Sequence, residues 1–376
     1  MSRLRLRTPD SIIGIDASRL SVTQRTGTEN YTYEILQAMA RIAPDEAIRL
    51  YLNASTLPVG IDLPWETRPI PFPRFWTHAR LSAETALHPP KLLWVPAHVI
   101  PLVHPRSVVT IHDLGYLHEP DAHPDRQRRM LHATTRWSVR EAAHIIAISE
   151  TTKRDLVERY HVAPINITVA PHGVSDRFER VNEAEIAELR ARLHLPVHFV
   201  LAVGTVQPRK NYAELARAVA RMRAKGLPHT LVIAGKQGWM AAQVTDEIEQ
   251  VGLKESVRLL GYVDDGDLPA LYSAADVVAF PSRYEGFGLP ALEAMRCGTP
   301  VVASNRGALP EVVGDAAIVV NLSNSDDLPD ALIRVSTNAE LRTGLIERGF
   351  ERATEFTWER SAQITLDVLR EQAAYV

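Results

Sequence analysis

Residues 277–295 read VVAFPSRYEGFGLPALEAM, and the interpretation of the rest of the chain starts from this stretch. It begins with an apolar run, which predicts a short buried strand. A loop with two glycines follows, and a helical pattern then has Pro290 in its first turn, where the missing N–H costs nothing. Gly298 fits the end of this helix, just before the next apolar run. The order of strand, glycine-rich loop and helix is typical of parallel α/β sheets.

The same alternation of apolar runs and helical patterns extends along almost the whole chain. Strands are expected at residues 11–16, 92–95, 108–111, 144–148 and 167–170, and a second set at 199–203, 230–234, 257–260, 277–280 and 300–303. Helices are expected between them, at 28–41, 126–142, 183–193, 212–223, 268–274 and 289–297. Two such sets predict an α/β protein of two doubly wound, Rossmann-like domains that face each other across a cleft.

The length of the chain also indicates two domains, because 376 residues exceed what one hydrophobic core usually supports. Turn residues at 171–174, followed by a charged helical stretch up to about Val197, predict the boundary. We therefore expect an N-terminal domain at 1–178 and a C-terminal domain at 179–356. The remaining residues, 357–376, predict one more helix, which packs within the second domain or crosses back to the first.

The composition excludes several classes of protein. A formal net charge of −3 gives no reason to expect a nucleic-acid binder. The single cysteine, Cys297, excludes an internal disulfide and a cluster of cysteine metal ligands, and it fits a reducing cytoplasm. No run approaches the roughly 18 apolar residues of a membrane span, so we expect a cytoplasmic protein, at most peripheral at the inner face of the membrane. For the basic stretch 126–140, with Phe75 and Trp76 upstream, a solvated face is favoured over contact with an anionic membrane or acceptor.

The glycine-rich loop predicts a site for an anion such as a diphosphate. Gly286 and Gly288 let the backbone approach a ligand, and the N–H groups at the helix start point at it. Glu285 and Glu293 would repel a phosphate, so they fit better as acceptors for hydroxyls on its two sides, a sugar and a ribose. A tight turn with two solvated glutamates is the plainer alternative. The dinucleotide fingerprint G-x-G-x-x-A also matches here, but it belongs at the first strand of a domain, so nicotinamide binding is not favoured.

The spacing Glu285-(seven residues)-Glu293, within PSRYEGFGLPALEAMRCGTPVVAS, resembles the E-x7-E segment of the family 4 retaining glycosyltransferases, which have the two-domain GT-B fold. The resemblance implies a nucleotide-diphosphate sugar as the donor. It also implies that Glu285 contacts the donor sugar and Glu293 the donor ribose. The backbone amides of Phe287, Gly288 and Leu289 would hold the diphosphate.

Residues 201–211, LAVGTVQPRKN, are similar to a second segment of the family. There, basic residues face the β-phosphate and neutralise charge on the leaving group. Many members carry an arginine directly after the glycine, where this chain has Thr205, so the role falls to Arg209 and Lys210. A solvated helix start is the alternative. Cations are unfavourable at a helix amino terminus, which favours the functional interpretation.

Residues 25–31, RTGTENY, resemble the glycine-rich loop that reaches the donor phosphates from the first domain. Gly27 stands where members often carry two glycines, which would place it against the substrate. A helix start capped by Thr26 or Thr28 explains the pattern nearly as well.

A further match is VTIHDL, residues 109–114, in which His112 directly follows an apolar run. The end of a parallel strand is where cleft residues lie. By the resemblance, His112 contacts the sugar and helps to order the reacting groups, while Asp113 orients the ring or contacts the acceptor. A core histidine with satisfied hydrogen bonds is the alternative.

No metal or other cofactor is expected. Tyr262 and Val263 stand where family members recognise the nucleobase through backbone groups, so their side chains do not indicate which base is bound. Asp265-Gly266-Asp267 matches the D-x-D metal motif of another glycosyltransferase fold, but capping of the next helix by Asp267 is the better explanation. The histidines at 112, 118, 123 and 132 lack a zinc-site spacing.

The resemblance as a whole implies a metal-independent, retaining hexosyltransferase with front-face attack on the donor. The segments GTVQPRKN and AGKQGW are similar to bacterial members that build cell-surface polysaccharides, often from GDP-mannose, so mannose is the expected sugar. A growing surface glycan or a lipid-linked sugar is the expected acceptor. The alternatives are a nucleotide-sugar epimerase or a non-catalytic nucleotide-sugar binder of the same fold. A phosphorylase would need a pyridoxal-type cofactor, for which the sequence has no lysine motif.

Overall fold

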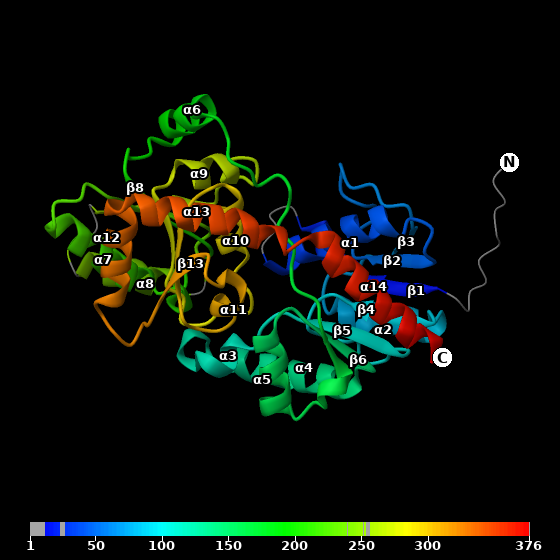
Figure 1. Ribbon diagram of the computed structural model, residues 1–376. Coiled ribbons are helices and arrows are strands. Elements are labelled where there is room, and N and C mark those ends of the chain that lie inside the picture. Colours follow the sequence, from blue (N-terminus) through cyan, green and yellow to red (C-terminus); the bar gives the residue numbers. More distant parts are fainter. Residues whose placement is uncertain (1–11, 23–26, 239, 251, 253–255, 376) are drawn as a thin grey trace. The chain divides into compact units, whose positions relative to one another are not determined.

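The computed structural model describes residues 12–22, 27–238, 240–250, 252 and 256–375 (Figure 1). The chain forms two compact units, each built around one parallel sheet. The first unit comprises Met1–Leu114, Arg126–Gly173 and Thr357–Val376, and the second comprises Gly115–Asp125 and Val174–Phe356. The C-terminal segment therefore belongs to the first unit, and a short segment of the N-terminal half belongs to the second.

The first unit holds a seven-stranded sheet in the order β3-β2-β1-β4-β5-β6-β7, in which all neighbours are parallel. Its strands are β1 (Ile13–Asp16), β2 (Ile48–Leu52), β3 (Glu66–Pro69), β4 (Leu92–Val95), β5 (Ser107–Ile111), β6 (His144–Ala147) and β7 (Ile167–Val169). The strands at the centre, β1, β4 and β5, are buried along their whole length, as expected for parallel strands with both faces covered.

The second unit holds a six-stranded parallel sheet in the order β10-β9-β8-β11-β12-β13. Its strands are β8 (Phe199–Val203), β9 (Thr230–Ala234), β10 (Val257–Gly261), β11 (Val277–Phe280), β12 (Val301–Ser304) and β13 (Ala317–Val320). The strand order reverses between β8 and β11. In doubly wound folds a ligand binds at this switch point, outside the carboxyl ends of the strands.

Helices connect the strands within each unit (Figure 1). Those of the first unit are α1 (Gly27–Ile42), α2 (Ser82–Leu87), α4 (Asp125–Glu141), α5 (Glu150–Tyr160) and α14 (Trp358–Ala374). Those of the second are α3 (Gly115–His118), α6 (Glu183–Leu193), α7 (Tyr212–Ala224), α8 (Ala241–Gln250), α9 (Leu268–Ala274), α10 (Leu289–Arg296), α11 (Leu309–Val313), α12 (Asp327–Thr337) and α13 (Ala339–Thr354). Shorter turns are η2 (Ser18–Ser21), η3 (Trp76–Leu81), η4 (Pro120–Ala122), η5 (Pro164–Asn166) and η6 (Pro208–Lys210). In the part of the chain described, no helix combines the length and apolar character that a membrane crossing requires.

The helix α14 packs on α1 in the first unit. Trp358 at its start is buried, and its ring stacks on that of His172 with centroids 5.5 Å apart. Thr357 caps the helix by accepting a hydrogen bond from the N–H of Arg360. A side chain at Gly173 would place its Cβ 2.1 Å from the backbone nitrogen of Trp358, so only glycine allows this close approach.

The α/β prediction with two sets of parallel strands is confirmed, and the strand ends differ from expectation by one or two residues. The pattern missed β2, β3 and β13. The four residues of β3 are all exposed at the edge of the sheet and form no apolar run, whereas β13 is apolar but partly exposed at the edge of the other sheet.

Thr28 and Asp267 do not cap helices as expected, and the other expected cap of the first helix, Thr26, lies outside the described residues. Thr28 lies inside α1, which begins at Gly27, while Arg25 and Thr26 lie outside the described residues. Asp267 precedes α9 but its side chain makes no capping hydrogen bond. Its two carboxylate oxygens instead accept from the guanidinium of Arg192, at 2.9 and 2.6 Å, because an ion pair was available on the neighbouring helix α6.

Candidate active site

A cluster of two cations and one carboxylate lies at the switch point of the second unit, with Lys210 and Glu285 buried and Arg209 half-buried. Lys210 ends the turn η6 after β8, and Glu285 lies in the loop after β11, the strand next to it in the sheet. The Nζ of Lys210 donates to Oε1 of Glu285 at 2.7 Å, and Nη1 of Arg209 lies 2.9 Å from Oε2. Parallel strands end at the same edge of a sheet, which brings together residues 75 positions apart in the sequence.

The electrostatics of this cluster keep Glu285 ionised. Burial by itself would raise the pKa of Glu285, but the charges of Arg209 and Lys210, with hydrogen bonds from Lys210 and Ser282, lower that pKa to about 2. The carboxylate therefore carries its charge at neutral pH. One negative charge faces two positive ones, so the cluster has a net positive charge and can attract an anion.

The backbone around Glu285 is held by contacts that the sequence did not predict. The guanidinium of Arg209 also donates to the carbonyl of Tyr284, and the N–H of Arg283 donates to the carbonyl of Arg209 at 2.9 Å. Gly307 has a φ of 59° and packs so closely that a Cβ there would lie 2.3 Å from the carbonyl oxygen of Glu285. No sequence signal separates Gly307 from an ordinary turn glycine.

Two glycines after strand ends allow close packing here, Gly204 against the Lys210 side chain and Gly235 against the backbone of Gly204. A Cβ at Gly204 would lie 3.1 Å from Cε of Lys210, and the φ of 145° there also favours glycine. A Cβ at Gly235 would lie 2.0 Å from the carbonyl oxygen of Gly204. The hydroxyl of Tyr212 donates to that carbonyl at 3.1 Å, and the Lys210 ammonium lies 4.8 Å from the centroid of the Phe280 ring.

The glycine-rich loop leads into α10 as expected. The helix begins at Leu289, and Gly288 precedes it with a φ of 108°, a conformation that side chains disfavour. Phe287 is buried, with its ring centroid 5.8 Å from that of Phe356. The backbone amides proposed to hold a diphosphate, those of Phe287, Gly288 and Leu289, thus stand at the positive end of the helix dipole.

Glu293 lies one turn into α10 and is buried. The hydroxyl of Tyr272, on α9, donates to its Oε2 at 2.7 Å. Burial and the charge of Glu293 hold the pKa of Tyr272 well above its ordinary value, so this hydroxyl stays a donor. Tyr272 is a neighbour of the site that sequence reasoning missed, because the pair joins two helices 21 residues apart.

The predicted nucleobase contacts lie after β10. Tyr262 has an exposed fraction of 36%, and the ammonium of Lys236 lies 5.1 Å from its ring centroid, whereas Val263 is buried. A further aromatic contact was not foreseen: His118, at the end of α3, stacks on Tyr284 with centroids 4.4 Å apart and planes at 12°. Tyr284 directly precedes Glu285, so His118 packs beside the charged cluster.

In the first unit, His112 follows β5 and is buried. Its Nε2 lies 2.8 Å from the carbonyl of Pro96, and its backbone N–H donates to Nε2 of His98 at 2.7 Å. Burial, reinforced by His98, lowers the pKa of His112 to about 4, so the ring is neutral. Because a carbonyl can only accept, Nε2 must carry the proton, and Nδ1 is left as an acceptor.

The other predicted residues of the first unit lie near this histidine or at the start of α1. Tyr31, on α1, meets His112 edge to face with centroids 4.7 Å apart. The carboxylate of Asp113 raises the pKa of His98 and His112 slightly against the larger effect of burial. Gly27 is the first residue of α1 and is exposed.

Both halves of the chain match known families. Residues 25–178 match the model described as Glycosyltransferase Family 4, and residues 187–352 match the model described as Glycosyl transferases group 1. The chain is 28% identical over 370 residues to O-antigen chain mannosyltransferase B of Escherichia coli, covering 92% of this chain and 96% of that protein. It is 34% identical over 293 residues to a D-inositol 3-phosphate glycosyltransferase of Actinosynnema mirum, covering 73% and 69%. Among solved structures, sucrose-phosphate synthase from Thermosynechococcus elongatus matches with a TM-score of 0.75 and 21% identity, over 97% of this chain and 99% of that one.

Two Rossmann-like units with parallel sheets, together with these matches, define a glycosyltransferase of the GT-B fold. The chain belongs to glycosyltransferase family 4, as the segment around Glu285 and Glu293 predicted. It is therefore an enzyme that transfers a sugar from a nucleotide sugar, and the matches do not favour the epimerase or the non-catalytic binder.

Proposed function

We propose that this enzyme is a retaining hexosyltransferase that needs no metal ion and transfers mannose from a nucleotide-diphosphate donor to a glycan or lipid-linked acceptor. The observation that carries the proposal is the cluster of Arg209, Lys210 and Glu285 beside the loop that starts α10. Two fixed cations can neutralise the negative charge that a leaving diphosphate develops, a role that a metal ion can fill in other enzymes. The mannosyltransferase among the relatives supports the choice of sugar.

The donor would lie along the cluster and the loop. The diphosphate oxygens would accept hydrogen bonds from Lys210 and Arg209 and from the amides of Phe287, Gly288 and Leu289. Glu285 would accept from hydroxyls of the sugar, since its lowered pKa keeps it an acceptor at neutral pH. Glu293 would accept from the ribose hydroxyls, and the backbone at Tyr262 and Val263 would contact the base.

The first unit would contribute His112, Asp113 and Gly27 to the substrates. His112 is neutral and poorly basic, so it suits a hydrogen bond to the sugar through Nδ1 better than removal of a proton. In front-face attack, the acceptor oxygen forms a bond to the anomeric carbon on the side from which the diphosphate leaves. The bond from that carbon to the diphosphate oxygen breaks, and the hydroxyl proton passes to the leaving diphosphate.

We place the enzyme in the cytoplasm, acting on surface-polysaccharide or lipid-linked precursors, with a solvated face on α4 as the favoured interpretation and peripheral contact at the inner face of the membrane as the alternative. Arg126 and Arg129 on α4 are exposed, and Met130 beside them is 58% exposed, which supports contact with anionic lipid. Cosedimentation with vesicles of anionic lipid, compared with neutral vesicles, measures this contact. If equal amounts of the protein sediment with both kinds of vesicle, α4 has a solvated face and does not contact anionic lipid.

The test of the transfer reaction is release of nucleoside diphosphate from a panel of nucleotide sugars, with and without a lipid-linked acceptor and with a chelator present. We expect turnover that needs the acceptor and survives the chelator, and a product whose anomeric configuration, measured by NMR, equals that of the donor. A binder would release no diphosphate, and an epimerase would convert the donor without the acceptor.

The same assay tests the leaving-group role of Lys210. Replacing its ammonium by an apolar side chain of similar length, Lys210→Met, should lower turnover at least about a hundredfold. Lys225→Met is the matched control, because Lys225 is an exposed lysine of the same unit. Turnover of Lys210→Met close to that of the control, with both proteins folded by circular dichroism, would remove the role.

A further inference from the structure

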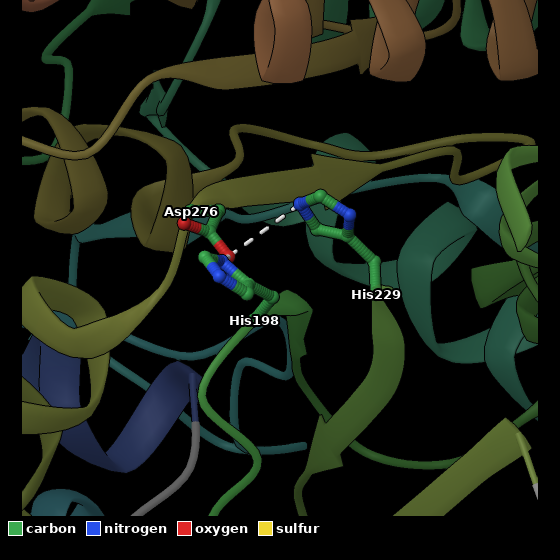
Figure 2. A group of neighbouring side chains, drawn as sticks. All are labelled: His198, His229 and Asp276. Carbon is green, nitrogen blue, oxygen red and sulfur yellow. Dashed lines mark hydrogen bonds and ion pairs between the residues drawn. The ribbon is translucent and has the colours of Figure 1, made fainter. Parts of the chain in front are cut away.

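A second cluster of chemically active side chains lies at the opposite edge of the second unit's sheet (Figure 2). His198, His229 and Asp276 each stand immediately before a strand, namely β8, β9 and β11. These three strands are neighbours in the sheet, in the order β9-β8-β11. Because they run parallel, the residues that precede them meet at the amino-terminal edge.

The distances within this cluster suit a tetrahedral metal ion. Nδ1 of His198 lies 3.3 Å from Oδ2 of Asp276, and Nε2 of His229 lies 3.5 Å from the same oxygen. The candidate ligand atoms all lie within 4.8 Å of one another. Two ligand atoms bound to one zinc ion at about 2.0–2.1 Å with tetrahedral angles lie about 3.3–3.4 Å apart.

The backbone holds the three residues in place. The N–H of Phe199 donates to Oδ2 of Asp276 at 2.9 Å, and the N–H of Asp276 donates to the carbonyl of Phe199 at 3.1 Å. The N–H of Thr230 donates to the carbonyl of His198 at 3.1 Å. The sheet therefore fixes the positions of the side chains without any ion, which is the preorganisation that a metal site requires.

His229 is the residue that a simple ion pair does not explain. Its exposed fraction is 5%, and its Nδ1 has no hydrogen-bond partner among the residues that the structure describes. Its other nitrogen has only the 3.5 Å contact with Asp276. Nε2, the nitrogen that faces Asp276, can therefore bind an ion while Nδ1 carries the ring proton.

An ion pair accounts for His198, which is half exposed and hydrogen-bonds to Asp276. A second imidazole lies at the same carboxylate oxygen, with its Nε2 3.5 Å from that oxygen, too far for a strong hydrogen bond, and with ring centroids 5.6 Å apart. Two protonated rings at that distance would repel each other. A metal ion can bind both rings in their neutral form, together with the carboxylate.

We propose that His198, His229 and Asp276 bind one divalent transition-metal ion, with Zn²⁺ as the best fit and water in the fourth position. Two imidazole nitrogens and one carboxylate favour zinc over magnesium or calcium, which prefer oxygen ligands. The five residues of β8 separate this edge from Lys210, a span of about 16 Å at about 3.3 Å per residue. The ion therefore ties three strand ends together and takes no part in sugar transfer.

The proposal is tested on the whole chain, freed of metal by a chelator and then titrated with Zn²⁺ or Co²⁺ alone. We expect one ion bound per chain, a higher melting temperature with zinc, and the strong visible absorption of tetrahedral Co²⁺. The variants His198→Ala and Asp276→Asn should each weaken binding at least about tenfold. Both should fold, since His198 is half exposed and asparagine can still accept from the N–H of Phe199.

His194→Asn is the control, because His194 is an exposed histidine of the same unit in a left-handed conformation that asparagine tolerates. It should bind zinc like the unchanged chain. Absence of stoichiometric binding by the unchanged chain, or equal binding by all variants, would leave the cluster an ion pair only. Neither result depends on transfer activity, so the outcome is independent of the proposed function.

Discussion

At the scale of single residues, the candidate site depends on how buried charges are compensated. Glu285 is buried, and a buried carboxylate without partners would become neutral. Arg209 and Lys210 keep it ionised and lower its pKa to about 2. This lowered pKa contributes stability that is fully present above about pH 4.5 and is lost as the pH falls toward 2. The cluster is therefore intact over the whole physiological range.

The buried histidines of the first unit make its stability depend on pH in a different window. Burial lowers the pKa of His112 from 6.5 to about 4, and that of His172 falls as well. Between pH 6.5 and about pH 4, His112 of the unfolded chain takes up a proton that His112 of the folded chain does not. The free energy of unfolding therefore falls as the pH falls through this range. His112→Asn removes one such group and should reduce the stability lost between pH 7 and pH 5 by up to about 2 kcal/mol.

The measurement is urea unfolding of the whole chain at pH 7 and pH 5, followed by circular dichroism. The unchanged chain, measured at the same two pH values, is the control. The same loss of stability in His112→Asn as in the unchanged chain would show that this ring titrates normally in the folded protein.

At the scale of elements, the active-site groups come from segments that end at one edge of a sheet. The turn after β8 brings Lys210, and the loop after β11 brings Glu285, because these strands are neighbours although two others lie between them in sequence. The loop after β12, which contains Gly307, holds the backbone of Glu285. In this loop the N–H of Ala308 donates to the carbonyl of Glu285 at 2.8 Å. Three consecutive strand ends of the sheet thus build one site.

The close contact at Gly307 predicts a specific loss of activity. A methyl group there would displace the backbone of Glu285, which a Cβ would approach to 2.3 Å. Gly307→Ala should therefore lower kcat/KM at least about tenfold, since misplacement by about 1 Å can cost a hundredfold. Steady-state kinetics of donor turnover measures the effect.

Gly226→Ala is the matched control for this prediction. Gly226 also has a positive φ, 87°, but a Cβ there would meet no heavy atom of the described residues within 4 Å. The two substitutions share a conformational strain of about 1–2 kcal/mol and differ in the contact. Equal kcat/KM in both variants would mean that strain alone, not the position of Glu285, sets the effect.

At the scale of the whole molecule, the last helix, α14, belongs to the first unit, although the residues directly before it in sequence belong to the second unit. Two units share one strand order around their switch points, and α14 belongs to the unit formed mainly by the first half of the chain. Trp358 anchors this helix against His172 and Tyr31, with ring centroids 5.5 and 6.0 Å apart. The first unit is therefore incomplete until the end of the chain is present.

Removing the anchor should loosen the C-terminal helix. Trp358→Ala is expected to cost the first unit about 3–5 kcal/mol, as for other large buried aromatic side chains. Limited proteolysis should then cut near residue 357 sooner than in the unchanged chain, and thermal unfolding should begin earlier. Arg41→Ala removes an exposed ion pair between Arg41 on α1 and Glu359 on α14, and it should lower the free energy of unfolding by less than about 1 kcal/mol. Similar proteolysis of both variants would contradict the anchoring role.

The α/β class, the buried central strands and the family could all be predicted from the amino-acid sequence. Continuous apolar runs, the glycine-rich loop and the helix that starts near Pro290 are local features. The spacing of apolar residues indicates a strand or a helix, and a glycine indicates where the backbone needs a positive φ. The spacing of Glu285 and Glu293 was readable for the same reason, since both belong to one loop and one helix. The roles assigned to the site residues stay predictions.

Which distant residues meet could not be predicted from the sequence and became visible in the folded chain. The pairs Lys210 with Glu285, Tyr272 with Glu293 and Gly307 with Glu285 depend on strand order, which no local pattern contains. The cluster of His198, His229 and Asp276 follows from the same cause: its spacing resembles no metal motif, yet three neighbouring strands begin beside it. Local patterns cannot predict these contacts because the hydrogen bonds of a parallel sheet join strands that are far apart in the chain, and those bonds decide which strands are neighbours and in which register.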